Sequence, residues 1–145
     1  MKFTVYGNPT GKGRPKFSRR GNFVHTYTPE KTANYEDLVI ISYNQAKTVE
    51  DLKLFDKPLK VDIKAFYPTT TNPITKKKFN KKESALALSN DIKAVIKPDV
   101  DNVIKIILDA LNGVAYKDDN QIVKLTAEKI YSTNPRVEIE IILAD

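Results

Sequence analysis

The sequence predicts an α+β domain of two layers, in which two main helices lie on one face of a four-stranded mixed sheet. Apolar residues recur with a period of two in four segments and with a helical period in two others. These segments follow in the order strand, helix, strand, helix, strand, strand, which suits helices packed on one sheet. The chain has 145 residues, 41% of them hydrophobic, so residues 1–145 are expected to form one domain.

The N-terminal segment is predicted to form a strand followed by a basic loop. Phe3 and Val5 alternate with polar residues, and the strand ends at Gly-Asn-Pro, residues 7–9. Residues 10–28 mix glycine, basic and aromatic side chains, and a small hairpin turning at residues 20–22 fits them.

A helix and a second strand come next. Thr28 as the N-cap and Pro29 as the first helical residue predict a helix that runs to about Lys47. Residues 59–67 alternate between apolar and polar side chains, as a strand does. The polar, lysine-rich residues from about 69 to 98 are interpreted as an excursion from the core.

The second helix begins near Asp101, which can serve as its N-cap, and Gly113 occupies the place of a C-terminal glycine. A strand follows, with Val123 and Leu125 predicted to point inward and a bulge expected near Lys129. Residues 137–143 alternate again and complete the sheet. The broad apolar face of this helix consists of Val103, Ile106, Ile107, Ala110 and Leu111.

Composition excludes several kinds of chemistry. The chain has no cysteine and one histidine, His25, so disulfides, thiolate metal sites, histidine zinc clusters and a Ser-His-Asp triad are excluded. Any catalysis must therefore depend on carboxylates and lysines. The longest apolar run, residues 141–144, is far too short to span a membrane, and the N-terminus lacks a secretory signal. We therefore expect a cytoplasmic protein without a membrane partner.

Charge is unevenly distributed along the chain. The net charge is +6. Residues 53–97 hold eleven bases and four acids, whereas residues 98–145 hold five bases and nine acids. Such an arrangement is expected if lysines and arginines bind phosphates while a local group of carboxylates binds a metal ion. The alternative is a solvated surface on which charges happen to be grouped.

The residue types most suited to catalysis lie just before and within the second helix. Asp99 and Asp101 are two residues apart, so in an extended segment their carboxylates project to the same side. Lys105 lies one helical turn beyond Asp101. A capping Asp101 paired with Lys105 would explain part of this pattern without any function, but it leaves Asp99 unexplained. Asp118 and Asp119 form a second acidic pair, of which only one is expected to face a metal ion.

Carboxylates without histidine or cysteine favour Mg²⁺, with Mn²⁺ as a substitute, because these ions prefer oxygen ligands. Hydrolysis of a phosphodiester is the reaction that follows from such a site. Whether one or two ions bind stays open.

The chain resembles the RusA-like Holliday-junction resolvases, in the form common in Gram-positive bacteria and their phages. The resemblance covers nearly the whole chain and depends on five segments, which are Gly-Lys-Gly-Arg-Pro-Lys-Phe at 11–17, Tyr-Thr-Pro at 27–29 with Tyr-Glu at 35–36, Lys-Pro-Asp-Val-Asp-Asn at 97–102, Leu-Asp-Ala-Leu-Asn-Gly at 108–113, and Tyr-Lys-Asp-Asp-Asn-Gln-Ile-Val at 116–123.

The resemblance implies a homodimeric, Mg²⁺-dependent endonuclease that resolves four-way DNA junctions by paired symmetric nicks in recombination and repair. It implies metal-binding carboxylates at Asp99, Asp101 and Asp119 and a catalytic lysine at Lys105, and it leaves the roles of Asp109 and Asp118 open. It also implies a bacterial or prophage origin and work in the cytoplasm or nucleoid. A non-catalytic DNA-binding or architectural phage protein and a nuclease for flaps or other branched DNA are the alternatives.

Two groups of basic residues are candidates for DNA contact. The first is interleaved with aromatic residues, as in proteins that bind nucleic acid backbones and stack on bases. The second fits a junction arm as well as it fits a solvated surface. The candidate residues are Lys12, Arg14, Lys16, Arg19 and Arg20 in the first group, and Lys76, Lys77 and Lys78 in the second.

Overall fold

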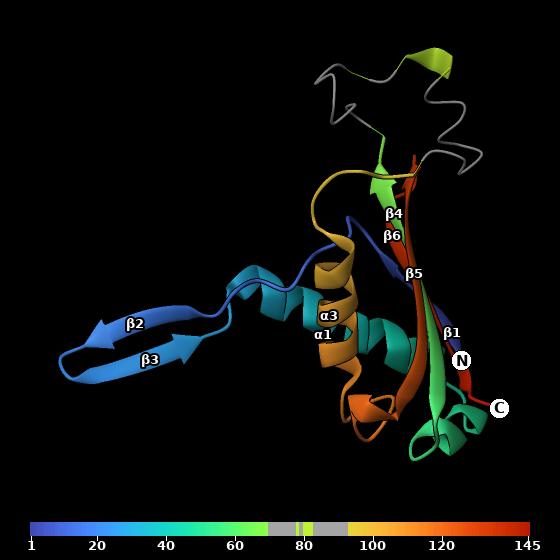
Figure 1. The fold of residues 1–145 in the computed structure, drawn as a ribbon, viewed down its shortest axis with the longest axis horizontal. Helices are drawn as coiled ribbons and strands as arrows, with labels where there is room; N and C mark the ends of the chain where they lie inside the picture. The colour runs from blue at the N-terminus through green and yellow to red at the C-terminus, as the bar shows by residue number, and fades with distance from the viewer. Residues whose placement is uncertain (70–77, 79, 83–92) are drawn as a thin grey trace.

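The computed structural model describes residues 1–69, 78, 80–82 and 93–145, and it confirms the predicted α+β architecture (Figure 1). Most of the lysine-rich excursion lies outside the described residues. The strands are β1 (Lys2–Tyr6), β2 (Lys16–Arg20), β3 (Phe23–Tyr27), β4 (Leu59–Pro68), β5 (Ile122–Ser132) and β6 (Arg136–Leu143). The helices are α1 (Glu30–Ala46) and α3 (Val100–Leu111), with the 3₁₀ helices η1 (Glu50–Leu54) and η2 (Asp119–Gln121).

The main sheet has four strands in the order β1-β6-β4-β5. It is mixed, because β4 pairs in parallel with β5 and antiparallel with β6, and β1 pairs antiparallel with β6. On β4 the side chains of Val61, Ile63 and Ala65 are buried while the residues between them are more exposed, as the alternating sequence predicts.

Both helices cover one face of this sheet. The five predicted apolar residues of α3 are all buried, and Tyr35, Val39 and Tyr43 bury the inner face of α1. They pack against Phe3, Val5 and the inner residues of β4 in one continuous core. This core holds the start of α3 at the same end of the molecule as the end of β4, because the Tyr67 hydroxyl donates to the Pro98 carbonyl at 2.7 Å.

Several details differ from the sequence prediction. Pro29 is the N-cap of α1, in place of Thr28, and α3 begins at Val100 with Asp99 as its N-cap, so Asp101 lies inside the first turn. The bulge in β5 falls at Val123, where the register with β4 shifts, and not near Lys129. Lys129 instead continues the inward row of the strand in regular register.

The inward positions of β5 are also less covered than predicted. Val123 is 63% exposed and Leu125 is 39% exposed, because β5 is the last strand of the sheet and no described strand pairs with its outer edge at these residues. An alternating pattern in the sequence identifies a strand, but it does not reveal whether that strand lies at the edge of the sheet.

The predicted hairpin is present as strands β2 and β3, which turn at Gly21 with a φ of +60°. It extends away from the body of the molecule, and all of its strand residues are exposed (Figure 1). Among the described residues, none of the helices combines the length and the apolar character needed to cross a membrane.

Candidate active site

An open cleft lies at the N-terminal end of α3. Its volume is about 520 Å³. One wall is the loop that follows β1, another is the start of α1, and the third is the segment that enters α3. The lining residues are Pro9, Thr10, Gly11, Lys12, Gly13, Pro29, Lys31, Thr32, Lys97, Pro98, Asp99 and Asn102. The cleft therefore brings one lysine from each of its three walls next to Asp99, one of the predicted carboxylates.

Two glycines allow the loop to approach both helices closely. A Cβ atom on Gly11 would lie 2.8 Å from the Cβ of Pro98, and one on Gly13 would lie 2.5 Å from Oγ1 of Thr32. The backbone N–H of Gly13 donates to that hydroxyl at 3.1 Å, and the N–H of Lys12 donates to the Asn102 carbonyl at 3.0 Å. The loop is thus attached to α1 on one side and to α3 on the other.

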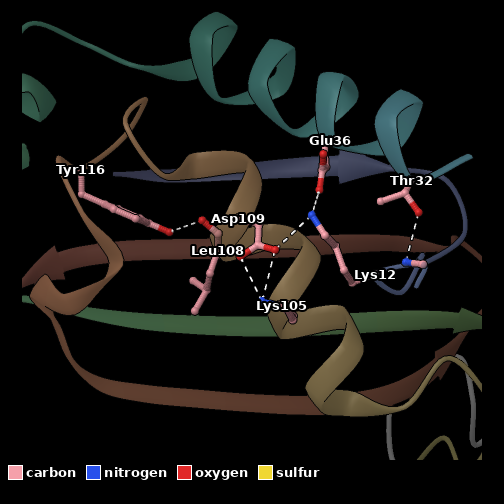
Figure 2. A network of polar contacts seen from close by, with 8 residues as sticks. Lys12, Thr32, Glu36, Lys105, Leu108, Asp109 and Tyr116 are labelled. Carbon is pink, nitrogen blue, oxygen red and sulfur yellow. Dashed lines mark hydrogen bonds and ion pairs between the residues drawn. The ribbon is translucent and has the colours of Figure 1, made fainter. Parts of the chain in front are cut away.

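Lys12 reinforces this attachment through its side chain (Figure 2). Its ammonium group pairs with Glu36 of α1 and lies 3.0 Å from Asp109 of α3. Burial acts to lower the pKa of Lys12, but the two carboxylates outweigh it and raise the pKa above 10.5. Sequence analysis assigned Lys12 to DNA, whereas in the structure its charge is balanced within the protein.

Asp99 and Asp101 lie at the entrance to α3, and both are exposed. Asp99 occupies the N-cap position, yet its side chain accepts no capping hydrogen bond. Neither carboxylate forms a hydrogen bond or ion pair with the described part of the chain. The positive end of the helix dipole favours negative charge here. Both groups are therefore available to an external ligand.

Two further residues of this region were missed by the sequence analysis. The Lys129 ammonium donates to the Ile96 carbonyl and lies 5.0 Å from the centre of the Tyr67 ring. Burial lowers the pKa of Lys129, and the charge of Asp99 opposes that shift. Burial, with Tyr35 and Asp99 adding to it, raises the pKa of Tyr67 well above its usual range. The signal in the sequence that could have indicated Lys129 was a lysine at a position of the strand pattern that points toward the core.

The acidic pair after α3 divides into two roles. The carboxylate of Asp118 accepts from the Asn120 N–H at 3.0 Å and caps η2. That of Asp119 is exposed and forms no hydrogen bond or ion pair with described residues. Of the two, Asp119 is therefore the one available as a ligand.

Asp119 does not lie near Asp99 and Asp101 within one chain. The turn that carries it follows the other end of α3, where Tyr116 donates to the Leu108 carbonyl at 2.8 Å. Burial, together with the charges of Asp119 and Asp109, raises the pKa of that tyrosine. Since α3 has 12 residues, its two ends are roughly 18 Å apart. The described residues accordingly contain no group of three side chains able to hold a metal ion.

Lys105 lies between these ends, and its side chain is 62% exposed. Its ammonium group is 3.4 Å from the carboxylate of Asp109, one turn further along α3 (Figure 2). This ion pair is exposed and therefore weak, so Lys105 can exchange it for another anion.

The other predicted DNA-binding residues are distributed over two regions. Arg14 and the hairpin residues Lys16, Arg19 and Arg20 are all exposed, and Phe17 and Phe23 of the same hairpin are exposed beside them. Lys76 and Lys77 lie outside the described residues, and Lys78 is exposed. Exposed cations next to exposed aromatic rings suit a nucleic acid strand, whose phosphates and bases both find partners.

Fold and site together describe a small α+β domain in which two carboxylates, unpaired within the described residues, lie beside basic residues, a combination that suits a nuclease. Comparison of the sequence with known families gives the particular family. Residues 6–142 match the family described as endodeoxyribonuclease RusA, and the chain belongs to this family. The chain is also 38% identical over 142 residues to the "Uncharacterized protein YqaN" of Bacillus subtilis (strain 168), covering 97% of this chain and 94% of that protein. The family description makes the chain an endodeoxyribonuclease, and the family acts on branched DNA.

Proposed function

We propose that this protein is a Mg²⁺-dependent endonuclease that resolves four-way DNA junctions by paired symmetric nicks, in the recombination and repair of DNA in the bacterial cytoplasm. The observation that carries this proposal is that Asp99 and Asp101, at the N-terminal end of α3 beside a basic cleft, have no partner in the part of the chain that the structure describes. A protein that only binds DNA gains nothing from free carboxylates that face its phosphates.

The proposed ligands are the oxygens of Asp99, Asp101 and Asp119, a donor set that fits Mg²⁺ or Mn²⁺. A bound ion of this kind supplies a Lewis acid for the scissile phosphate and lowers the pKa of a water nucleophile. Lys31 and Lys97, which line the cleft, hold the phosphodiester next to the carboxylates. Lys105 leaves Asp109 to offset the negative charge that develops on the phosphate in the transition state.

The position of Asp119 adds a requirement. Within one chain, Asp119 and Asp101 lie at opposite ends of α3, roughly 18 Å apart. A single copy of the chain therefore cannot provide all three ligands. A second copy provides the third ligand in our proposal, and a symmetric dimer then has two equal sites. Two equal sites are what paired symmetric nicks require.

A cleavage assay tests the reaction. Purified protein is incubated with a labelled synthetic four-way junction in Mg²⁺, in Mn²⁺ and in EDTA, and the products are separated on denaturing and native gels. Paired metal-dependent nicks that yield ligatable duplexes are expected. Preferential cleavage of a competing flap would favour the branched-DNA nuclease, and tight binding without any nick would favour the architectural protein.

The Asp101→Asn variant tests the site. It removes one metal ligand and one negative charge near DNA, so cleavage should fall by at least about 100-fold while junction affinity stays equal or rises. Asp62→Asn is the matched control, because Asp62 lies on the sheet face that the helices do not cover. Cleavage by Asp101→Asn at the wild-type rate would show that this carboxylate is not a ligand.

A further inference from the structure

The segment that enters α3 is attached to the main sheet at every second residue. The Ala94 N–H donates to the Lys129 carbonyl at 2.9 Å, and the Lys129 ammonium group donates to the Ile96 carbonyl. The Tyr67 hydroxyl donates to the Pro98 carbonyl at 2.7 Å. Two side chains of the sheet, Lys129 of β5 and Tyr67 of β4, therefore hold this segment in place.

Exposure alternates along the same segment, so its other side is turned to the cleft. Residues 94, 96 and 98 are buried or half-buried, whereas Val95, Lys97 and Asp99 are exposed. Lys97 and Asp99 both line the cleft. The attachments to the sheet thus decide which side of the segment, with its lysine and its carboxylate, is presented to a ligand.

The carboxylate of Asp99 depends on these attachments for its position. Its side chain accepts no capping hydrogen bond, whereas its backbone carbonyl accepts from the Val103 N–H at 3.1 Å. The backbone of Asp99 is thus fixed by α3 on one side and by the attached Pro98 on the other. A ligand that is placed in advance loses less conformational freedom when an ion binds, so the ion binds more tightly.

Lys129 occupies a position of the sheet that packing alone would give to an apolar residue. It is in register with the buried Ala65, on the face that the helices cover. A partly buried ammonium group costs free energy unless it has partners, which here are the Ile96 carbonyl and the Tyr67 ring, 5.0 Å away. Burial lowers the pKa of Lys129, and the negative charge of Asp99 opposes that shift, so the ammonium lies within electrostatic reach of that carboxylate.

We propose that Lys129 is a positioning residue for Asp99, and that Tyr67 assists it by holding the Pro98 carbonyl. Lys129 lies on the sheet side of the segment and is not among the described residues that line the cleft, so it acts through the segment and not on the ion or the DNA. This inference deepens the proposed function and rests on it, because it takes Asp99 to be a ligand of Mg²⁺ or Mn²⁺.

Binding of Mn²⁺ to the purified full chain without DNA tests the proposal, with the free ion followed by electron paramagnetic resonance. Lys129→Met keeps an unbranched side chain but loses the ammonium group, so the dissociation constant of Mn²⁺ should rise by about tenfold or more. Lys129→Arg can donate to the same carbonyl and should restore most of the affinity. Lys124→Met is the matched control, because it removes the same charge from an exposed position of β5 and should leave the constant unchanged.

The sign of the effect separates positioning from a plain effect of charge. A cation near a metal site repels the ion, so Lys129→Met would bind Mn²⁺ more tightly if Lys129 acted only through its charge. Tighter or unchanged binding would therefore overturn the proposal. Junction affinity in EDTA should stay at the wild-type value, and a parallel loss of that affinity would count against a role confined to Asp99.

Two further variants complete the test. Tyr67→Phe removes one hydroxyl and leaves the buried ring in the core, so the Mn²⁺ constant should rise by about fivefold, and an unchanged constant would also overturn the proposal. Asp99→Asn separates this inference from the proposed function. If Asp99→Asn binds Mn²⁺ as the wild type does, the ligand assignment of the proposed function is contradicted. If Asp99→Asn loses the ion but Lys129→Met does not, only the positioning role is contradicted.

Discussion

The aspartates around α3 differ in what their carboxylates contact, and this difference separates structural roles from catalytic ones. Asp109 pairs with two lysines and Asp118 caps η2, so both are satisfied within the chain. Asp99, Asp101 and Asp119 are exposed at the two ends of the same helix. Carboxylates that serve the fold are paired or hydrogen-bonded, whereas those that bind an external ion must be left available.

Replacement of Lys12 by methionine tests the structural role of that residue. The change leaves Glu36 and Asp109 close together without a cation, so the free energy of unfolding should fall by about 1–3 kcal/mol. Urea denaturation followed by circular dichroism measures this. Lys2→Met, at an exposed position of β1, is the control and should change stability by less than about 0.5 kcal/mol. Equal stability of both variants would argue that the Lys12 pairs contribute nothing.

The ion pairs of Lys12 also predict how the stability of the protein depends on pH. The pKa of Lys12 is raised above 10.5 in the folded protein, so its stabilising effect is complete below that pH and is lost as the pH rises through the folded value. The stability difference between wild type and Lys12→Met should therefore be constant from about pH 7 to pH 9 and shrink above about pH 10.5. A difference that grows at alkaline pH would contradict this assignment.

At the scale of elements, the loop between β1 and the hairpin connects both helices to the cleft. Its two glycines come close to Pro98 and Thr32, and no side chain larger than hydrogen fits at either position without movement. The loop is thereby held against the start of α3 and of α1, and Arg14 follows it directly in the chain.

Gly11→Ala should therefore weaken both stability and cleavage. Its Cβ would lie 2.8 Å from Pro98 and 3.1 Å from Asn102, which forces the loop away from the start of α3. Such overpacking costs about 1–3 kcal/mol. Thermal unfolding and single-turnover cleavage measure the two effects. Gly21→Asn is a suitable control, because asparagine tolerates positive φ and nothing lies within 4 Å of that site. Wild-type behaviour of Gly11→Ala would show that the loop is not held there.

The hairpin is a separate element whose exposure predicts a role in binding rather than in stability. Replacement of Lys16, Arg19 and Arg20 by alanine should make the slope of log affinity against log salt shallower by about 2–3 for a four-way junction, since each phosphate contact contributes about 0.9. Unfolding free energy should change little, because all three side chains are exposed. The control for the loss of net charge is a variant in which three other lysines are replaced together, namely Lys47, Lys53 and Lys57. An unchanged slope would exclude these residues from contact with phosphate.

At the scale of the whole molecule, the sequence predicted the helices and strands and their order. It did not predict which strand lies at the edge of the sheet or where the exposed carboxylates lie relative to one another. Periodicity predicted the layers, the α3 core face and the hairpin because each depends on local pattern. The alternation of residues 122–132 could not show that β5 is an edge strand. Spacing likewise could not show that Asp119 lies at the opposite end of α3 from Asp101, since this depends on the path of the chain after the helix.

That separation leads to the last prediction, which concerns mixtures of two inactive chains. Asp101→Asn and Asp119→Asn each remove a ligand from every site of their own homodimers, so neither alone should cut a junction. In a mixed dimer with sites shared between subunits, one site carries both changes and the other carries none. Mixing the two variants should therefore restore single nicks, visible on a denaturing gel, without release of duplexes on a native gel.

The control mixture combines Asp99→Asn with Asp101→Asn, two changes at the same end of α3. Here each site of a mixed dimer still lacks one ligand, so nicking should not return. If instead one chain supplied all three ligands, neither mixture would contain an intact site, and both would stay inactive. Restored nicking in the first mixture alone thus requires that Asp119 act across the dimer, because no arrangement within one chain gives that pattern.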